Sequence, residues 1–249
     1  MPAVLCLLLV TIFFPLGELE QMLVGKGVGL KGVKGILTPG FIFMCAITIL
    51  SSMGMFCFIN NLPFLVVERQ LGDPAMVGGL MSLFSLARVV IGVLFGILIA
   101  TIAKYTLPFG LFCEALGMVI MLLAGDASLL PVAAFIFGIG NGIQVYAGYE
   151  YVVETVDPGG FTLALAIFMT MTSVGVSIEP LVVNTLAGGE IASNNFMIGA
   201  VLFGIAVVAM LIREIFFHKD SRIGKSLKSR EEFEGEELPA SDETAVAEG

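Results

Sequence analysis

Residues 76–103 read MVGGLMSLFSLARVVIGVLFGILIATIA and contain a single charged side chain, Arg88. A helix of this length rises about 42 Å, more than the roughly 30 Å hydrocarbon core of a bilayer. Five further runs of similar composition are separated by segments rich in glycine, proline and asparagine. We therefore expect six membrane-spanning helices, approximately Pro39–Asn60, Met76–Ala103, Tyr105–Ala124, Leu130–Val152, Phe161–Leu186 and Asn194–Phe217.

The composition of the whole chain supports a membrane environment. Of its 249 residues, 57% are hydrophobic and 13% are charged, and the mean hydropathy is +1.01. A soluble domain is nearer half apolar and one quarter charged, so the polar residues here cannot cover a water-soluble particle of this size. Disordered, collagen-like, coiled-coil and nucleic-acid-binding proteins are also excluded, because they need low hydrophobicity, a glycine period, charged heptads or a basic surface.

Residue types that carry enzyme and metal chemistry are sparse. Cys6, Cys45, Cys57 and Cys113 lie singly in apolar runs without CxxC spacing, which favours small apolar side chains over disulfides or metal ligands. His218 is the only histidine, so no zinc site or histidine-based catalytic set can be built. Neither HExxH nor GxSxG occurs in the sequence. We expect no enzyme activity, no cofactor and no metal.

The segments outside the six runs differ in composition. Residues 1–16 contain an apolar run that would rise about 21 Å as a helix, which predicts a partial transmembrane helix, with a signal peptide as the alternative. Residues 17–36 are rich in glycine and lysine and are expected to form a cytoplasmic connector, and residues 37–218 the domain of six spans. Residues 219–249 are expected to be a disordered cytoplasmic tail, and its eight acids after Arg230 account for most of the net charge of −9.

The basic residues predict an orientation in the membrane. Ten of the twelve precede the first span, join the second span to the third, or lie at or beyond the end of the last span. Arg69 lies on the opposite side, and Arg88 lies within the membrane. Because basic loops tend to remain in the cytoplasm, we expect a multi-pass protein of the plasma membrane with a cytoplasmic C-terminus.

An ordered set of short motifs resembles the C-terminal six-helix half of the major facilitator superfamily, over about residues 1–218. Asn61-Leu62-Pro63 leads into Gly72-Asp73-Pro74, and the second span ends in Gly96–Tyr105, a degenerate copy of the loop motif G-x-L-x-D-R-x-G-R-R. The copy keeps Gly96, Leu98 and Lys104 but has Ala100 in place of the acid and Ala103 in place of a glycine. Further matches are Gly138-Ile139-Gly140-Asn141-Gly142 in the fourth span and Gly175-Val176-Ser177-Ile178-Glu179-Pro180 in the fifth, where Glu179 replaces a glycine.

The resemblance implies an all-α polytopic membrane protein whose six helices form two inverted three-helix repeats. It also implies transport of a small solute by alternating access, with the substrate site near the membrane midplane between two six-helix halves. The N-terminal half would be supplied by the same native chain or by another chain, and the present chain would then be a fragment or a half-transporter. The alternative function is a membrane scaffold that pairs with another membrane protein without transporting anything.

Charged side chains inside the membrane are the first candidates for function. Each costs about 2.5–3.5 kcal/mol on insertion scales, so each should face a cavity or a partner. Arg88 could anchor an anionic or amphipathic organic substrate, or it could form an ion pair with Glu114 in the neighbouring span. Glu114 could itself be a protonatable coupling site, because burial favours the uncharged form of a carboxyl group.

Polar residues of the fourth and fifth spans complete the candidate substrate or ion pathway. Asn141 and Gln144 share one helix face and could bind substrate or make interhelical hydrogen bonds. Glu179 lies on one face with Thr172 and Gly175 and could serve a cation or a proton, or face the outer vestibule. Two remaining sets are predicted to be structural: Asn60 and Asn61 as caps or gate residues, and the pairs Gly92-x-x-x-Gly96 and Gly138-x-x-x-Gly142 as sites of close helix packing.

Overall fold

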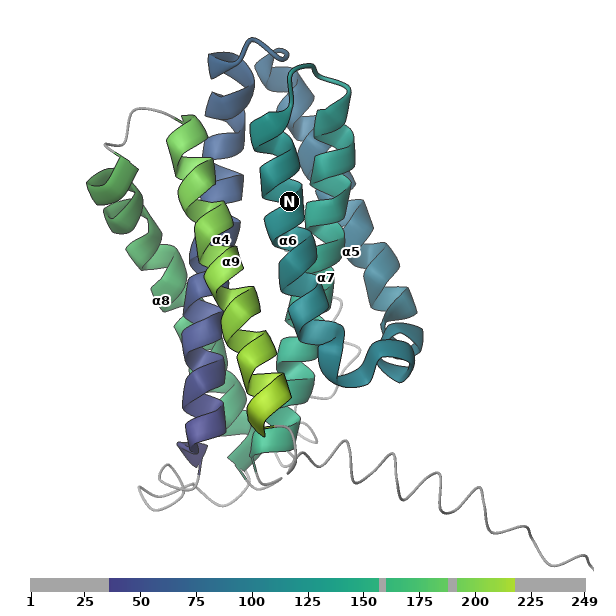
Figure 1. The fold of residues 1–249 in the computed structure, drawn as a ribbon, viewed down its shortest axis with the longest axis vertical. Coiled ribbons are helices and arrows are strands. Elements are labelled where there is room, and N and C mark those ends of the chain that lie inside the picture. Colours follow the sequence, from purple (N-terminus) through teal and green to yellow (C-terminus); the bar gives the residue numbers. More distant parts are fainter. Residues whose placement is uncertain (1–35, 157–159, 188–191, 218–249) are drawn as a thin grey trace, which may run out of the picture.

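The computed structural model describes residues 36–156, 160–187 and 192–217. These ranges contain α-helices, one short 3-10 helix and no strand (Figure 1). The expected partial helix within residues 1–16, nearly all of the connector 17–36 and the tail 219–249 lie outside the described residues. The elements are α4 (Pro39–Glu68), α5 (Pro74–Ile102), η1 (Ala103–Tyr105), α6 (Thr106–Leu123), α7 (Leu129–Thr155), α8 (Phe161–Ala187) and α9 (Ala192–Phe217).

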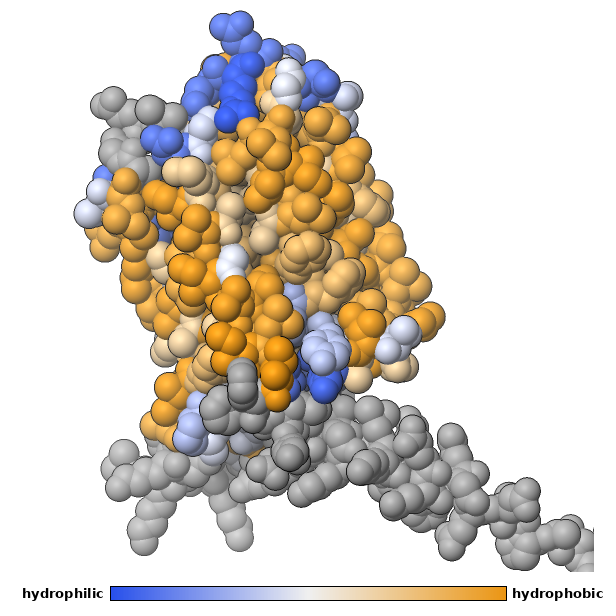
Figure 2. All heavy atoms as spheres, viewed as in Figure 1, coloured by the Kyte–Doolittle hydropathy of each residue, from blue (hydrophilic) through white to orange (hydrophobic). Residues whose placement is uncertain are grey.

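The helices have the length and composition of membrane spans. Five continuous helical stretches among the described residues are long and apolar enough to cross a bilayer, and one of them, Ala75–Leu123, runs through α5, η1 and α6. In Figure 2 the side of the molecule is mostly hydrophobic, and hydrophilic residues gather at its upper end. An apolar band between polar ends is the surface that a bilayer requires. The prediction of an all-helical polytopic membrane protein is confirmed.

Local sequence explains where several helices begin. Thr38 and Asp73 precede α4 and α5, and their side chains accept hydrogen bonds from the backbone N–H groups of Phe41 (3.2 Å) and Met76 (3.0 Å). Each cap is followed by a proline in the first turn, where the missing N–H costs nothing. In the turn before α7, Ser128 donates to Asp126 from its backbone and its hydroxyl group, which lowers the pKa of that exposed carboxyl group.

One predicted boundary was wrong. The stretch around Asn60 and Pro63 was expected to end the first span, but α4 continues through Pro63 to Glu68. Pro63 removes one backbone hydrogen bond near the end of the helix. The following turn is held by packing, because Leu65 and Val66 are fully buried against the core. Tertiary burial therefore outweighs the local helix-breaking signal.

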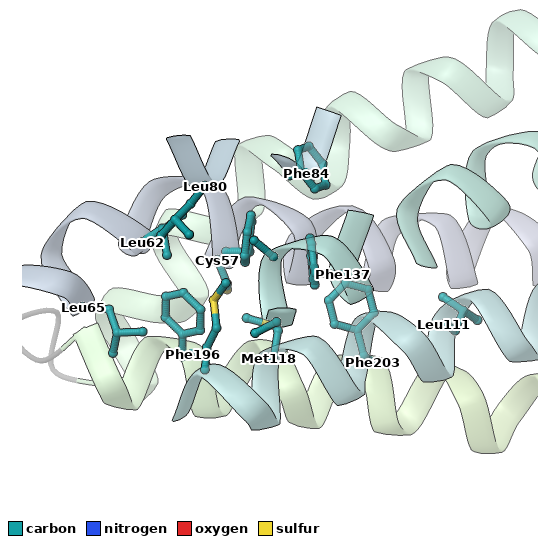
Figure 3. Close-up of a cluster of buried hydrophobic side chains, with 14 of the residues drawn as sticks. Cys57, Leu62, Leu65, Leu80, Phe84, Leu111, Met118, Phe137, Phe196 and Phe203 are labelled. Atoms are coloured by element: carbon teal, nitrogen blue, oxygen red, sulfur yellow. The ribbon is translucent and has the colours of Figure 1, made fainter. Parts of the chain in front are cut away.

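The helices α4, α6, α7 and α9 make most of the contacts between helices. Helix α7 packs against α5 and α6, α4 packs against α8 and α9, and α6 packs against α9. The centre is a cluster of buried hydrophobic side chains that includes several aromatic rings (Figure 3). Phe58 of α4 stacks on Phe137 of α7 with ring centroids 4.0 Å apart, and Phe203 of α9 meets Phe137 edge-on at 5.8 Å. These contacts join the two sequence halves of the bundle.

A polar cluster at the end of α4 fixes the start of α9. The carboxylate of Glu68 accepts from the backbone N–H of Ala192 (2.7 Å) and from the hydroxyl of Ser193 (2.8 Å). Arg69 donates to Ser193 (3.1 Å) and to the backbone oxygen of Leu122 at the end of α6. Glu68 therefore caps α9 from a distant part of the sequence, and a negative charge there also matches the helix dipole.

We expect Glu68→Ala to destabilise the fold by about 1 kcal/mol, the usual cost of a lost helix cap. The free energy of unfolding in mixed detergent micelles measures this change. Glu150→Ala is the matched control, since Glu150 is an exposed glutamate of α7. Equal stability of the two variants would show that the Glu68 cap contributes nothing.

Candidate functional site

A small cavity lies between α4, α7 and α8. Its volume is about 100 Å³. Met55, Phe168 and Met169 contribute apolar wall. Its polar lining residues are Thr48 and Ser52 from α4, Asn141, Gln144 and Tyr149 from α7, and Thr172 from α8.

Four polar side chains form a continuous hydrogen-bonded chain beside this cavity, which we call the Glu114–Ser51 chain. The side-chain amide of Asn141 donates to Glu114 Oε1 of α6 at 2.9 Å and lies 3.4 Å from the amide oxygen of Gln144. Gln144 in turn donates to the hydroxyl of Ser51 on α4 at 2.5 Å. The chain crosses α6, α7 and α4, and its two amides also line the cavity. Polar side chains on three helices are thus brought together.

The chain lies at the middle of the helices. Helix α6 spans residues 106–123, α7 spans 129–155 and α8 spans 161–187, so Glu114, Asn141 and Thr172 are each within about two residues of a midpoint. In a membrane, the middle of a spanning helix lies near the bilayer midplane. Side chains there cannot reach headgroups or bulk water, so these polar groups depend on one another and on the cavity.

Glu114 is fully buried between two helices. Its side chain is fully buried where α6 and α7 approach closely through Gly110 and Gly140. A Cβ atom placed on Gly140 would lie 2.5 Å from the backbone oxygen of Gly110, so only glycine fits there. Among the described residues, Glu114 Oε2 and Asn141 Oδ1 are buried oxygen atoms without a hydrogen-bond partner. Buried polar atoms are nearly always paired, so these two need an explanation.

Arg88 and Glu114 do not form the ion pair that was considered for them. The ion pair found among the described residues joins Arg213 and Glu214 instead. The half-buried guanidinium of Arg88 lies 5.6 Å from the ring centroid of Phe84 on its own helix. Arg88 is not among the residues that line the cavity, so its predicted role as a substrate anchor stays a prediction.

Glu179 is separate from the Glu114–Ser51 chain. It is buried, and its Oε2 accepts a hydrogen bond from Asn60 at 3.1 Å. This arrangement differs from an acid exposed in an outer vestibule. Asn61 accepts from Asn195 of α9 at 2.7 Å and donates to the backbone oxygen of Cys57 at 2.9 Å. Asn60 and Asn61 therefore join helices rather than cap α4.

Comparison with known proteins shows the family. Residues 44–241 match the family described as Major Facilitator Superfamily. The chain belongs to this superfamily. Neither the curated proteins nor the solved structures gave a match. Superfamily members are membrane transporters and generally not enzymes, so the family agrees with the apolar helices in indicating a membrane transporter.

Of the four glycines expected to allow close helix packing, three have close neighbours on another helix and Gly96 has none. A Cβ atom on Gly138 would lie 2.5 Å from the backbone oxygen of Phe84, and one on Gly142 would lie 3.2 Å from the Cα atom of Arg88. Both bring α7 against α5. A Cβ atom on Gly92 would meet the Tyr146 hydroxyl at 2.6 Å, whereas one on Gly96 would have no atom within 4 Å. The prediction holds for the Gly138 pair and for Gly92.

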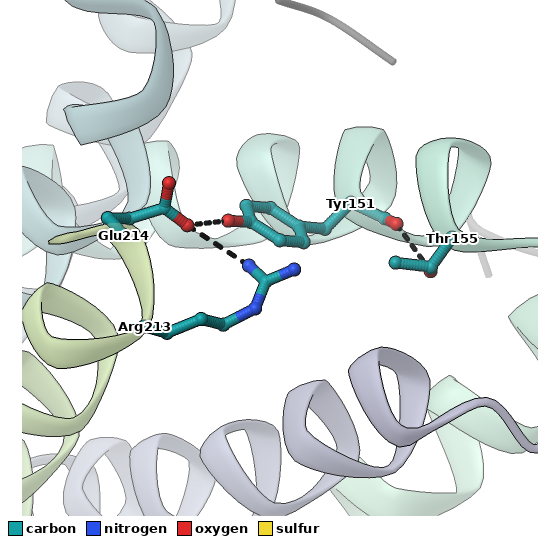
Figure 4. Close-up of polar contacts among 4 residues, drawn as sticks. All are labelled: Tyr151, Thr155, Arg213 and Glu214. Carbon is teal, nitrogen blue, oxygen red and sulfur yellow. Dashed lines mark hydrogen bonds and ion pairs between the residues drawn. The ribbon is translucent and has the colours of Figure 1, made fainter. Parts of the chain in front are cut away.

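A second polar cluster, which was not predicted from the sequence, joins α7 to α9 (Figure 4). Glu214 accepts hydrogen bonds from the Tyr151 hydroxyl and from Arg213 Nη1, the latter at 3.0 Å. The guanidinium carbon of Arg213 also lies 4.3 Å from the centroid of the Tyr151 ring. The signal was present in the sequence, because an arginine and a glutamate in the last turns of an apolar helix need partners.

No metal site is apparent in the part of the chain that the structure describes. Within residues 36–156, 160–187 and 192–217, no group of three or more histidine, cysteine, aspartate or glutamate side chains could hold an ion. Cys45, Cys57 and Cys113 are free thiols, and the latter two are buried, as expected of small apolar side chains. Cys6 lies outside the described residues.

Proposed function

We propose that this chain is one six-helix half of an alternating-access transporter and that its small solute binds at the cavity between α4, α7 and α8. The observation that carries the proposal is the Glu114–Ser51 chain beside that cavity. Polar groups at the middle of membrane helices are costly and usually mark a transport pathway. Their convergence on one small opening, in a superfamily of transporters, favours a substrate site.

The helix contacts support two inverted repeats, α4–α6 and α7–α9. If α4 is exchanged with α7, α5 with α8 and α6 with α9, the α5–α7 contact becomes the α8–α4 contact. The same exchange turns α6–α7 into α9–α4 and leaves α6–α9 unchanged, so every major contact has its mate. With three successive spans per group, the second group enters the membrane from the opposite side. Inverted repeats of this kind place substrate between them near the midplane.

The exposed surfaces support a second six-helix half, on the same native chain or another. Among the described residues, every exposed serine or threonine within an α-helix belongs to α5 or α8. Every large exposed side chain that the structure describes on α6 and α9 is apolar, as lipid contact requires. The cavity of about 100 Å³ is also well below the roughly 300–1,000 Å³ of complete small-molecule sites. A facing half over α5 and α8 would complete it.

The charges support a substrate class and an orientation. Arg88 at the middle of α5 has no carboxylate within ion-pair distance among the described residues, which favours an anionic or amphipathic organic substrate. Lys104 and Arg213 lie at the end where α4 begins, and Arg69 lies at the other end. This asymmetry supports a cytoplasmic C-terminus. The plasma membrane is the location we propose. A proton is the proposed coupling ion, because a carboxyl group belongs to the polar chain.

A thermal-stability screen of the purified chain in lipid nanodiscs tests this function. The probes are a panel of small organic carboxylates, with organic amines and neutral sugars of similar size as controls. We expect some carboxylates to raise the melting temperature, since a ligand at about one hundred times its Kd adds about 2.7 kcal/mol of stability. No response to any carboxylate, with a response to amines or sugars, would overturn the anionic assignment, and no response to any probe would overturn solute binding at the cavity of this half by itself.

Arg88→Gln is expected to weaken carboxylate binding roughly ten- to one-hundredfold, because a hydrogen bond to a charged group contributes about 1.5–3 kcal/mol. Its melting temperature without ligand should stay close to that of the unmodified chain, since Arg88 has no ion-pair partner to lose. Arg88→Lys keeps the charge and should keep part of the response. An unchanged response in Arg88→Gln would remove Arg88 from the site.

A further inference from the structure

The unpaired oxygens of Glu114 and Asn141 have complementary chemistry. An ionised carboxylate accepts hydrogen bonds through both oxygens, yet Glu114 receives one from the amide of Asn141, at Oε1, and none at Oε2 among the described residues. A carboxylic acid carries a hydroxyl donor on its second oxygen. The carboxamide of Asn141 offers a buried acceptor, Oδ1, that lacks a donor. A proton on Glu114 Oε2 would therefore supply the hydrogen-bond donor that this contacting pair of side chains lacks.

Desolvation favours the same assignment. Glu114 is fully buried at the close approach of α6 and α7, and an isolated charge is very costly in such a place. The charged side chain whose field reaches Glu114 is Arg88 on α5, and it makes no ion pair with it. The thiol of the neighbouring Cys113 is the titratable group beside Glu114 on α6, and α7 contributes the neutral amide of Asn141.

We infer that Glu114 is a proton-binding site and that Asn141 is the positioning residue that connects its protonation state to the cavity. The connection to the cavity rests on the proposed transport function, whereas the proton site is inferred from the contacts of Glu114 alone. The Asn141 amide has the carboxyl group on one side and the cavity on the other. A change at Glu114 must therefore pass through a residue that lines the cavity.

Loss of the proton would rearrange the chain. The ionised Glu114 lacks a donor at Oε2, and its charge would draw the Asn141 amide away from Gln144 Oε1 and Met55 Sδ, which lie 3.4 and 3.1 Å from Asn141 Nδ2. Gln144 would then be free to turn from Ser51. The ionised carboxylate would also offset the charge of Arg88. Protonation of Glu114 therefore keeps the polar groups of the cavity ordered. It also leaves the positive charge of Arg88 without a nearby negative charge, so the proton and an organic anion should bind together.

Infrared difference spectroscopy of the purified chain in nanodiscs tests the proton site without any substrate. At neutral pH the unmodified chain is expected to show a carboxylic-acid C=O band that Glu114→Gln removes. Glutamine has nearly the shape of glutamate, and its side-chain oxygen can still accept from the Asn141 amide, so this variant should keep the observed hydrogen bond and its fold. Glu179→Gln is the matched control and should leave the Glu114 band in place. Asn141→Asp should shift that band, because the partner of the acid changes.

A second readout tests the coupling. In the unmodified chain, stabilisation by a responding carboxylate should fall from mildly acidic to mildly alkaline pH, and in Glu114→Gln it should not change with pH. A band that survives Glu114→Gln overturns the proton site, whatever the ligand screen shows. If replacing choline by Na⁺ in the buffer abolishes the band, the site binds Na⁺ instead of a proton. If the band is confirmed and no carboxylate binds, the transport proposal fails while the proton site stands.

Discussion

Replacing Gly138 by leucine is expected to destabilise the folded bundle strongly and to lower the yield of folded protein, whereas Gly96→Leu should fold normally. A Cβ atom on Gly138 would lie 2.5 Å from the backbone oxygen of Phe84 and 2.8 Å from Cβ of Ala87. A backbone oxygen cannot rotate away as a side chain can, so α5 must separate from α7. A Cβ atom on Gly96 would have nothing within 4 Å, although this glycine also belongs to a GxxxG pair, with Gly92.

The expected cost of Gly138→Leu lies at or above the upper end of the usual 1–3 kcal/mol for overpacking, because a helix rather than a side chain has to move. The yield of monodisperse protein on size-exclusion chromatography measures it, together with the free energy of unfolding. Gly175→Leu should behave like Gly138→Leu, since its Cβ atom would lie 2.6 Å from the backbone oxygen of Ile49 on α4. Equal yields of Gly138→Leu and Gly96→Leu would contradict the packing argument.

The course of the helices could be predicted because membrane spans are defined by length and hydrophobicity. The sixth expected span, Asn194–Phe217, differs from α9, Ala192–Phe217, only at its first turn. That difference has a tertiary cause, since the first turn of α9 is capped by Glu68, more than one hundred residues earlier. The continuation of α4 past Pro63 has a similar cause. Local signals set the spans, and packing sets their ends.

The candidate site could be predicted only in part. Helical spacing placed Asn141 and Gln144 on one face, and both line the cavity. The spacing along one helix cannot tell which neighbouring helix that face meets. For this reason the sequence left an ion pair of Glu114 with Arg88 open as one alternative, whereas in the fold Glu114 contacts Asn141, and the role of Ser51 was not predicted. Charge alone suggested an ion pair, but the close approach of α6 and α7 at Gly110 and Gly140 places the Glu114 carboxyl group against Asn141 of α7.

The second large effect is expected from Asn141→Leu. This change removes the donor to Glu114 Oε1 and leaves a fully buried carboxyl group with no hydrogen bond from the described residues. An orphaned buried polar group costs about 1–3 kcal/mol, and more if it is charged. Asn141→Leu should therefore lower the free energy of unfolding by at least this amount. It should also abolish the carboxylate response, because one of the amides that line the cavity is gone.

The double variant Glu114→Leu/Asn141→Leu separates these two losses. It removes both partners of the buried pair, and apolar groups of similar shape in place of a hydrogen-bonded pair can be nearly neutral for stability. We expect its unfolding free energy to return close to that of the unmodified chain, which gives a large coupling energy in the mutant cycle. Carboxylate binding and its pH dependence should stay lost. If the double variant is as unstable as the sum of the single variants, the two side chains act independently and Asn141 cannot transmit the protonation state of Glu114.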